Sequence, residues 1–177
     1  MILASVTEVL QPWSDFSHIP SAVLAAASAR GTEVHDICAT IARGLPLMKV
    51  SIDCVGYVDS YQRWFNLTVN EVLLVEERLV DDVFGYHGEP DLVIKSKQGE
   101  IVLIDNKTPV QLVKAWQLQC AGYSNLVKKN IAKPDRAGSL RLHPQGGIAK
   151  MTYYENSAQD LNLFLQALTL YRFFNNK

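Results

Sequence analysis

Apolar and polar residues follow a hairpin pattern most clearly between Gly88 and Thr108. A run that is apolar at first and then polar, Leu92–Lys97, is separated by Gln98–Gly99 from a second, continuously apolar run, Ile101–Ile104. Continuous apolar runs of this length are typical of strands that are buried on both faces. The pattern therefore predicts two antiparallel strands joined by a tight turn, with the second strand inside the sheet.

The length of this turn decides which residues lie opposite each other at the open end of the hairpin. A three-residue loop places Gly99 at the left-handed position that such loops favour and sets Asp91 opposite Asp105. A two-residue loop sets Asp91 opposite Asn106 instead, on the other face of the sheet. We prefer the three-residue loop because it uses the glycine where the backbone needs one.

Helical periodicity and capping residues predict the elements around the hairpin. A short helix is expected to begin at Ser5, its cap, and to end by Pro12. An alanine-rich helix is expected over Ser21–Ala29, with Arg30–Gly31 interrupting it and Thr32 capping a second helix. The remaining predictions are the rest of that second helix to Arg43, a helix over Ile52–Phe65, a strand over Glu71–Asp81, a helix over Gln111–Lys129, strands over Ser139–His143 and Ile148–Tyr154, a final helix over Ala158–Phe174, and loops at Pro12–Asp15, His18–Pro20 and Pro134–Gly138. This order predicts an α/β fold with a mixed central β-sheet flanked by helices, in a single domain covering residues 1–177.

The composition is that of an ordinary water-soluble globular protein, with 48% hydrophobic and 20% charged residues. No apolar run approaches the roughly 20 residues that span a bilayer, so no membrane association is expected. The N-terminal stretch lacks the basic start and long apolar segment of a signal peptide, which favours the cytoplasm. Cys38, Cys54 and Cys120 form no CxxC pair, and we expect neither disulfides nor a zinc or iron–sulfur site.

A net charge of −1 conceals two segments of opposite sign. Residues 71–105 carry nine acids against three bases, whereas residues 106–150 carry eight bases against one acid. A segment that attracts cations followed by one that attracts anions fits a metal-dependent enzyme acting on phosphates. Two solvated faces with no catalytic role are the alternative.

The open end of the hairpin gathers the residues with the most evident chemistry. Asp91 and Asp105 offer hard oxygen ligands, which suit Mg²⁺ or Mn²⁺. Side chains alternate along a strand, so Lys107 shares a face with Asp105. A cation held by such carboxylates can polarise a phosphodiester, and the lysine can contact the scissile phosphate or position a water molecule. A lone Asp-x-Lys is a weak signal, and a lysine at a strand end is usually a surface charge.

Pro90–Asp91 followed by Asp105–Asn106–Lys107 resembles the PD-(D/E)XK nuclease superfamily. Two flanking motifs resemble its RecB-like exonuclease branch. Gly31–His35 is similar to a helical motif that ends in a metal-binding histidine, and Gln119–Tyr123 matches the branch's Q-x-x-x-Y motif. The matched region covers residues 31–123, about half of the chain, and its motifs occur in the family's order.

The resemblance implies a restriction-endonuclease-like core and a role for each matched residue. His35, Asp91 and Asp105 are expected to bind Mg²⁺ or Mn²⁺, with the backbone carbonyl of Asn106 as a further ligand and Lys107 as the catalytic lysine. Gln119 and Tyr123 lie one helical turn apart and are expected to orient the active site or the nucleic-acid strand. Structural roles are the alternatives: a core histidine at His35, a strand start at Asp91, and a polar pair closing the core edge at Gln119 and Tyr123.

The function implied by this resemblance is metal-dependent hydrolysis of DNA, most directly by an exonuclease in DNA recombination, repair or phage DNA processing. An endonuclease of the same superfamily and a non-catalytic nucleic-acid-binding module on a nuclease fold are the two alternatives. Strand polarity, strand preference and oligomeric state have no signature in the sequence. DNA is the one partner that the resemblance implies.

Overall fold

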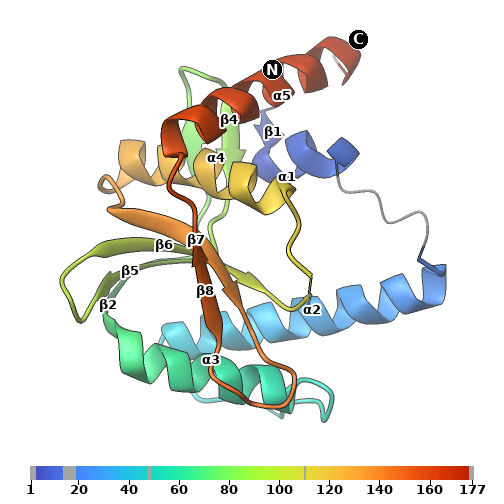
Figure 1. Cartoon of the computed structure of the whole chain (residues 1–177), viewed down its shortest axis with the longest axis vertical. Coiled ribbons are helices and arrows are strands. Elements are labelled where there is room, and N and C mark those ends of the chain that lie inside the picture. Colours follow the sequence, from blue (N-terminus) through green and yellow to red (C-terminus); the bar gives the residue numbers. More distant parts are fainter. Residues whose placement is uncertain (1–2, 14–18, 48, 110, 176–177) are drawn as a thin grey trace.

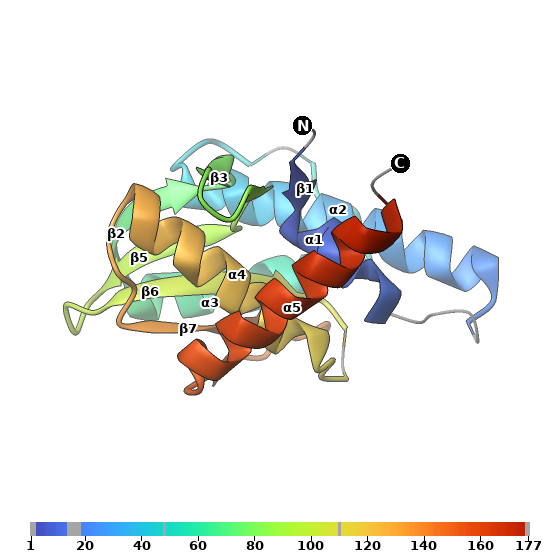
Figure 2. The ribbon, with the colours of Figure 1, turned by 90° about the horizontal axis from the view of Figure 1, so that it is seen from above.

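A five-stranded mixed β-sheet forms the centre of the computed structural model, which describes residues 3–13, 19–47, 49–109 and 111–175 (Figure 1). Its strand order is β2-β5-β6-β7-β8, with β6 and β7 parallel and the other neighbours antiparallel. Helices α2 (Ser21–Ala42) and α3 (Val55–Thr68) cover one face, and α4 (Ala115–Asn130) with α5 (Ser157–Asn175) covers the other (Figures 1 and 2). The strands are β2 (Val69–Val75), β5 (Leu92–Ser96), β6 (Ile101–Lys107), β7 (Arg136–Arg141) and β8 (Lys150–Tyr153). The layered architecture is the one that the order of elements predicts.

The β5–β6 hairpin has the three-residue register. Leu92 pairs with Ile104 and Val93 with Leu103. Gly99 has a left-handed φ of 88°, and its N–H donates to the Ser96 carbonyl at 2.9 Å. The preferred turn is therefore confirmed, and continuing the register places Asp91 beside Asp105.

Strand β6 is buried on both faces because it lies in the middle of the sheet. Val102 and Ile104 pack in the core under α2 and α3, whereas Leu103 packs in the core under α4 and α5. Since side chains alternate, Asp105 and Lys107 continue the row of Leu103, on the α4 side. The hydrophobic pattern of the strand thus directs its two terminal charges toward α4.

The predicted strand over Glu71–Asp81 is wrong as a single element. The chain forms β2, turns at Glu76, which has a φ of 47°, and starts β3 (Leu79–Asp81) in a second sheet. That sheet has the order β1-β4-β3 and includes β1 (Ala4–Ser5) and β4 (Tyr86–Gly88), which the sequence pattern does not predict. Strands of two or three residues are too short to show alternation, which explains the omission.

Helix α2 (Ser21–Ala42) is continuous, so the predicted interruption at Arg30–Gly31 is wrong. Thr32 does not cap a second helix, because its Oγ1 donates to the Ser28 carbonyl at 3.2 Å within the same helix. A glycine inside a helix costs only about 1 kcal/mol relative to alanine, which tertiary packing can offset.

The other helices agree with prediction to within a few residues. Helix α1 (Val6–Leu10) begins with a capping box in which Ser5 and Glu8 bond each other's backbone N–H, as its sequence predicts. The remaining helices are α3 (Val55–Thr68), α4 (Ala115–Asn130) and α5 (Ser157–Asn175), with a short 3-10 helix η1 at Gln11–Trp13. Predicted loops at Pro12–Asp15 and His18–Pro20 fall partly on residues 14–18, outside the described residues, and Pro134–Gly138 already contains the start of β7. No helix among the described residues is long and apolar enough to span a membrane.

Two helical glycines give a matched prediction for stability. A Cβ at Gly56 would lie 1.8 Å from the Pro144 carbonyl oxygen, whereas a Cβ at Gly31 would meet only Thr108 Oγ1, at 3.7 Å. Gly56→Ala is therefore expected to destabilise by about 2 kcal/mol or more through backbone displacement. Gly31→Ala is expected to stabilise by roughly 0.5–1 kcal/mol. Urea unfolding of both variants measures this contrast, and equal effects of the two substitutions would contradict it.

Candidate metal and catalytic site

The candidate site lies at the end of the β5–β6 hairpin, where four elements meet. Asp91 precedes β5, and Asp105 and Lys107 end β6. His35 reaches the same place from α2, and Gln119 reaches it from α4. The two halves of the site are joined through the backbone, because the Asn106 N–H donates to Asp91 Oδ2 at 2.6 Å.

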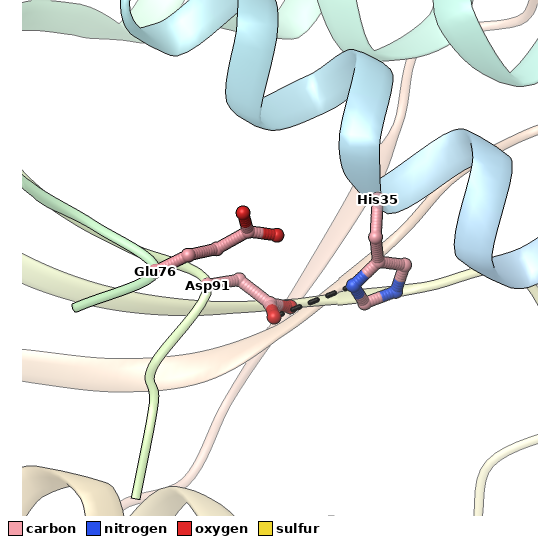
Figure 3. A group of neighbouring side chains, drawn as sticks. All are labelled: His35, Glu76 and Asp91. Carbon is pink, nitrogen blue, oxygen red and sulfur yellow. Dashed lines mark ion pairs between the residues drawn. The ribbon is translucent and has the colours of Figure 1, made fainter. Parts of the chain in front are cut away.

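The first half is a group of three possible metal ligands, His35, Glu76 and Asp91, shown in Figure 3. One ligand atom from each lies within 4.8 Å of the others, and His35 Nδ1 is 3.3 Å from Asp91 Oδ1. The side chains of His35 and Glu76 are each 30% exposed, and that of Asp91 is 15% exposed. The group is thus partly enclosed yet open to a cation.

The backbone turn at Glu76 brings this residue into the group. Its N–H lies 3.2 Å from the Pro90 carbonyl and 3.3 Å from the Asp91 carbonyl, which fixes the end of β2 against the start of β5. A positive φ is uncommon for a residue with a side chain and is often found at functional sites. Glu76 is not among the residues that the sequence predicts for the site, because its pattern of neighbours places it inside a strand, where it is one of nine acids in residues 71–105.

The charges in this group influence one another. Burial disfavours the protonated form of His35, but the charge and hydrogen bond of Asp91 outweigh it and raise the pKa of His35. Burial likewise opposes ionisation of Asp91, yet His35, Lys107 and the Asn106 N–H together lower the pKa of Asp91. Burial and the nearby Asp91 carboxylate raise the pKa of Glu76. The carboxylates of Glu76 and Asp91 repel each other, whereas the imidazole of His35 attracts Asp91. A cation bound between the two carboxylates would relieve their repulsion.

The second half of the site is a buried ion pair. Lys107 Nζ lies 2.7 Å from Asp105 Oδ2, with side-chain exposures of 13% and 2%. Burial raises the pKa of Asp105 to about 6, and Lys107 only partly opposes this shift. Burial also disfavours the Lys107 ammonium, but Asp105 and Asp91 outweigh it and raise the pKa of the lysine. Apart from this ion pair with Lys107, Asp105 Oδ2 has no partner among the described residues.

Side chains from α4 continue the network beyond the lysine. Lys107 Nζ donates to Gln119 Oε1 at 3.0 Å, and Gln119 Nε2 donates to the Tyr123 hydroxyl at 3.3 Å. The Trp116 ring centroid lies 5.4 Å from Lys107 Nζ, within the range of a cation–π contact. These contacts hold the ammonium on the Asp105 face of β6.

The structure brings six of the seven predicted side chains into two linked groups. His35 and Asp91 meet Glu76, while Asp105, Lys107, Gln119 and Tyr123 form a chain of contacts. The seventh, Asn106, has a buried side chain whose Oδ1 lacks a partner among the described residues. Alternation directs this side chain to the face of β6 opposite Asp105 and Lys107, and the Asn106 contact with the site is its backbone N–H, which donates to Asp91 Oδ2. The roles of all seven residues stay predictions.

The donor set fits a hard or borderline divalent cation. Carboxylate oxygens suit Mg²⁺ and Mn²⁺, whereas an imidazole nitrogen suits Mn²⁺ and later transition metals better than Mg²⁺. Asp105, whose carboxyl group interacts electrostatically with both Asp91 and His35, adds a further buried oxygen donor. Mn²⁺ therefore matches the mixed nitrogen and oxygen donors better than Mg²⁺ does.

Two cavities lie beside the hydrogen-bonded pair Gln119 and Tyr123, one lined by each residue. The larger, of about 480 Å³, lies beside Lys107 and is lined by Thr7, Glu8, Leu10, Gln11, Lys107, Ala115, Trp116 and Gln119. The smaller, of about 340 Å³, lies beside Tyr123 and is lined by Ser5, Thr7, His87, Gly88, Glu89 and Tyr123. Helix α1 contributes to the walls of both cavities, and its Thr7 lines each of them.

The fold is similar to that of a solved protein from Eubacterium rectale named "Putative exonuclease". That structure matches with a TM-score of 0.56 and 10% identity over 96% of this chain and 79% of the other. Another solved structure, SSO0001, matches with a TM-score of 0.44 and 12% identity over 99% of this chain and 77% of the other, which is too distant to add to the argument. No protein-family model and no curated protein matches the chain. The likeness to the first structure confirms the predicted fold class, a mixed sheet flanked by helices with a restriction-endonuclease-like core.

Proposed function

We propose that this protein is a Mn²⁺- or Mg²⁺-dependent deoxyribonuclease that acts as an exonuclease. The observation that carries the proposal is the direct connection between a His35–Glu76–Asp91 group and a buried Asp105–Lys107 pair through the Asn106 backbone. A cation site next to a buried ammonium is the arrangement that binds and hydrolyses a phosphodiester. The motif resemblance supports the same reaction and the choice of DNA, and the name of the Eubacterium rectale protein, which mentions an exonuclease, agrees with the reaction.

Each group in the site has a distinct task in this proposal. His35, Glu76 and Asp91 hold the cation, and Asp105 contributes a further carboxylate from the α4 side. A bound cation polarises the phosphodiester and lowers the pKa of a water molecule. Lys107 binds the scissile phosphate or orients that water, and Gln119 keeps the ammonium aimed at the site through its 3.0 Å hydrogen bond.

The assignment is tested by incubating labelled linear DNA and covalently closed circular DNA with the protein and Mn²⁺ or EDTA. We expect Mn²⁺-dependent release of nucleotides from linear DNA, none with EDTA, and no cleavage of circles. Cleavage of circular DNA would reassign the site to an endonuclease. Absence of cleavage with every divalent cation, on single- and double-stranded substrates, would reject the nuclease assignment.

Metal binding by the His35–Glu76–Asp91 group is a separate expectation. Mn²⁺ should bind more tightly than Mg²⁺ in calorimetry, because one of the ligands is an imidazole. Glu76→Gln should weaken Mn²⁺ binding by at least roughly tenfold, since it removes one ligand charge. Glu71→Gln on the same strand is the matched control, because Glu71 is exposed and outside the group. An unchanged affinity in Glu76→Gln would remove Glu76 from the site and leave the ligand set that the motifs predict.

A further inference from the structure

The cavity of about 480 Å³ beside Lys107 is not explained by cation binding or by phosphodiester hydrolysis alone. It shares Lys107 and Gln119 with the site, but its opposite wall comes from Thr7, Glu8 and Gln11 at the other end of the sequence. Its volume lies within the range of about 300–1,000 Å³ that small-molecule sites occupy. A cavity that opens beside a phosphate-binding group is a candidate for the rest of the substrate.

The walls of this cavity differ in chemistry. Trp116, Leu10 and Ala115 provide apolar surface, and Trp116 is only 8% exposed, which makes it a rigid part of the wall. Thr7, Glu8 and Gln11 provide hydrogen-bonding groups along the opposite rim. A flat aromatic ring with polar edges matches this combination, because its faces stack on apolar surface while its edge atoms meet donors and acceptors.

The charged side chains of Lys107 and Glu8 determine how an anionic ligand is oriented in the cavity. Lys107 and Glu8 both line the cavity, so an anionic group is attracted to the ammonium and repelled by the carboxylate. Glu8 is held in place because its Oε2 accepts the Ser5 N–H at 2.8 Å, and hydrogen bonds from Ser5 lower the pKa of Glu8. A nucleotide therefore binds with its phosphate at Lys107 and away from Glu8, and its base lies between the apolar surface of α4 and the polar side chains of α1.

Helix α1 is rigid enough to form such a wall although it is short. Its capping box closes the first turn, and Val6, Val9 and Leu10 are buried in the core that also contains Tyr123 and Leu126 of α4. Helix α1 packs against both α4 and α5 (Figures 1 and 2). The wall is therefore preformed, so little free energy is spent on ordering the protein when a ligand binds.

We propose that this cavity is a subsite for one nucleotide of the nucleic-acid strand, with the base against Trp116 and Ala115 and the phosphate at Lys107. The inference rests on the proposed nuclease function for the identity of the strand. It adds that α1 determines recognition of a base, so the substrate is bound by a nucleobase as well as by its phosphates.

The test is calorimetric binding of deoxyadenosine 5′-monophosphate, deoxyribose 5-phosphate and inorganic phosphate to the full chain, with no hydrolysis required. We expect the nucleotide to bind at least about tenfold more tightly than deoxyribose 5-phosphate, because base stacking contributes affinity of this order. Ala115→Phe, which fills the cavity from α4, should remove that difference. Ala26→Phe, at an exposed position of α2, is the matched control and should keep it.

A second filling variant, Gln11→Trp, approaches the same cavity from the opposite wall and guards against a folding defect in Ala115→Phe. Equal binding of nucleotide and deoxyribose 5-phosphate to the wild type would overturn the subsite, as would no detectable nucleotide binding. So would unchanged nucleotide affinity in both filling variants. A base-dependent affinity that the filling variants remove, in a protein that cleaves no DNA, would support the subsite and reject only the proposed nuclease.

Discussion

Asp105→Asn is expected to lower metal-dependent DNA cleavage by at least about 100-fold and, at the same time, to stabilise the folded protein at neutral pH. The loss of activity follows from removing a negative charge beside the proposed cation and beside Lys107, where a single electrostatic contact is typically worth about 10²–10³ in rate. The gain in stability follows from burial, since the carboxylate is 2% exposed and its pKa is raised to about 6. An amide resembles the protonated acid and avoids burying the charge. The Lys107 ammonium that loses this partner is the more exposed of the two, at 13%, and it keeps its hydrogen bond to Gln119, its contact with the Trp116 ring and the nearby charge of Asp91, so its own cost is smaller than that of a buried carboxylate left alone.

The sign of the effect depends on pH in a defined way. The pKa of Asp105 is about 6 in the folded state, whereas an aspartate in the unfolded chain has a pKa of about 3.9. Between these values the folded protein binds the extra proton, so stability of the wild type falls as pH rises from about 4 to about 6 and then stays lower. Asp105→Asn has no carboxylate at this position, so its stability does not fall in this way between about pH 4 and about pH 6. Its advantage should therefore be small near pH 4, grow through this window and level off above pH 6.

Thermal unfolding with EDTA between pH 4 and pH 8 measures this difference without a bound cation. Asp53→Asn is a suitable control because Asp53 is exposed, and its melting temperature should follow that of the wild type at every pH. A gap between Asp105→Asn and wild type that does not change with pH, or a variant that is less stable at pH 8, would contradict the burial argument. Full cleavage by Asp105→Asn would remove Asp105 from the proposed chemistry.

The hairpin was predictable from sequence because its information is local. Gly99 selects the turn, the turn sets the register, and the register brings Asp91 and Asp105 together. The burial of β6 follows in the same way from four consecutive apolar residues, Ile101–Ile104. Turn chemistry and strand alternation act over a few residues, so a pattern read along the chain contains the required information.

The rest of the site depends on contacts between distant segments. His35 and Gln119 lie in helices that carry no local sign of where they pack, and the motif resemblance, not periodicity, suggested their proximity to Asp91 and Lys107. Neither periodicity nor the motif resemblance indicated that Glu76 lies in the site. Its place depends on a positive φ and on hydrogen bonds to the carbonyls of Pro90 and Asp91, which exist only after β2 and β5 pair. The cavity wall formed by α1 depends likewise on packing between the first and fourth helices.

Lys107→Met should abolish cleavage to a similar extent as Asp105→Asn but have the opposite effect on stability. The substitution removes the ammonium that contacts Asp105 and Gln119, while the apolar part of the side chain is nearly preserved. Binding of Mn²⁺ should survive, because His35, Glu76 and Asp91 are unchanged. Retained metal binding with lost cleavage would separate a catalytic role of the lysine from a role in assembling the site.

The stability change in Lys107→Met tests whether Asp105 is held as a charged group by its partner. Removing one member of a buried ion pair typically costs about 3–5 kcal/mol, because the remaining charge stays buried without compensation. Loss of the ammonium raises the pKa of Asp105 further, so the acid is neutral at low pH and the cost should be smaller at pH 5 than at pH 8.

The double variant Lys107→Met/Asp105→Asn buries no charge at this pair and should recover much of the lost stability at pH 8. Lys128→Met, at an exposed position of α4, controls for the loss of a lysine elsewhere. A double variant as unstable as Lys107→Met alone would show that the lysine stabilises the fold through its hydrogen bond to Gln119, and not by neutralising Asp105.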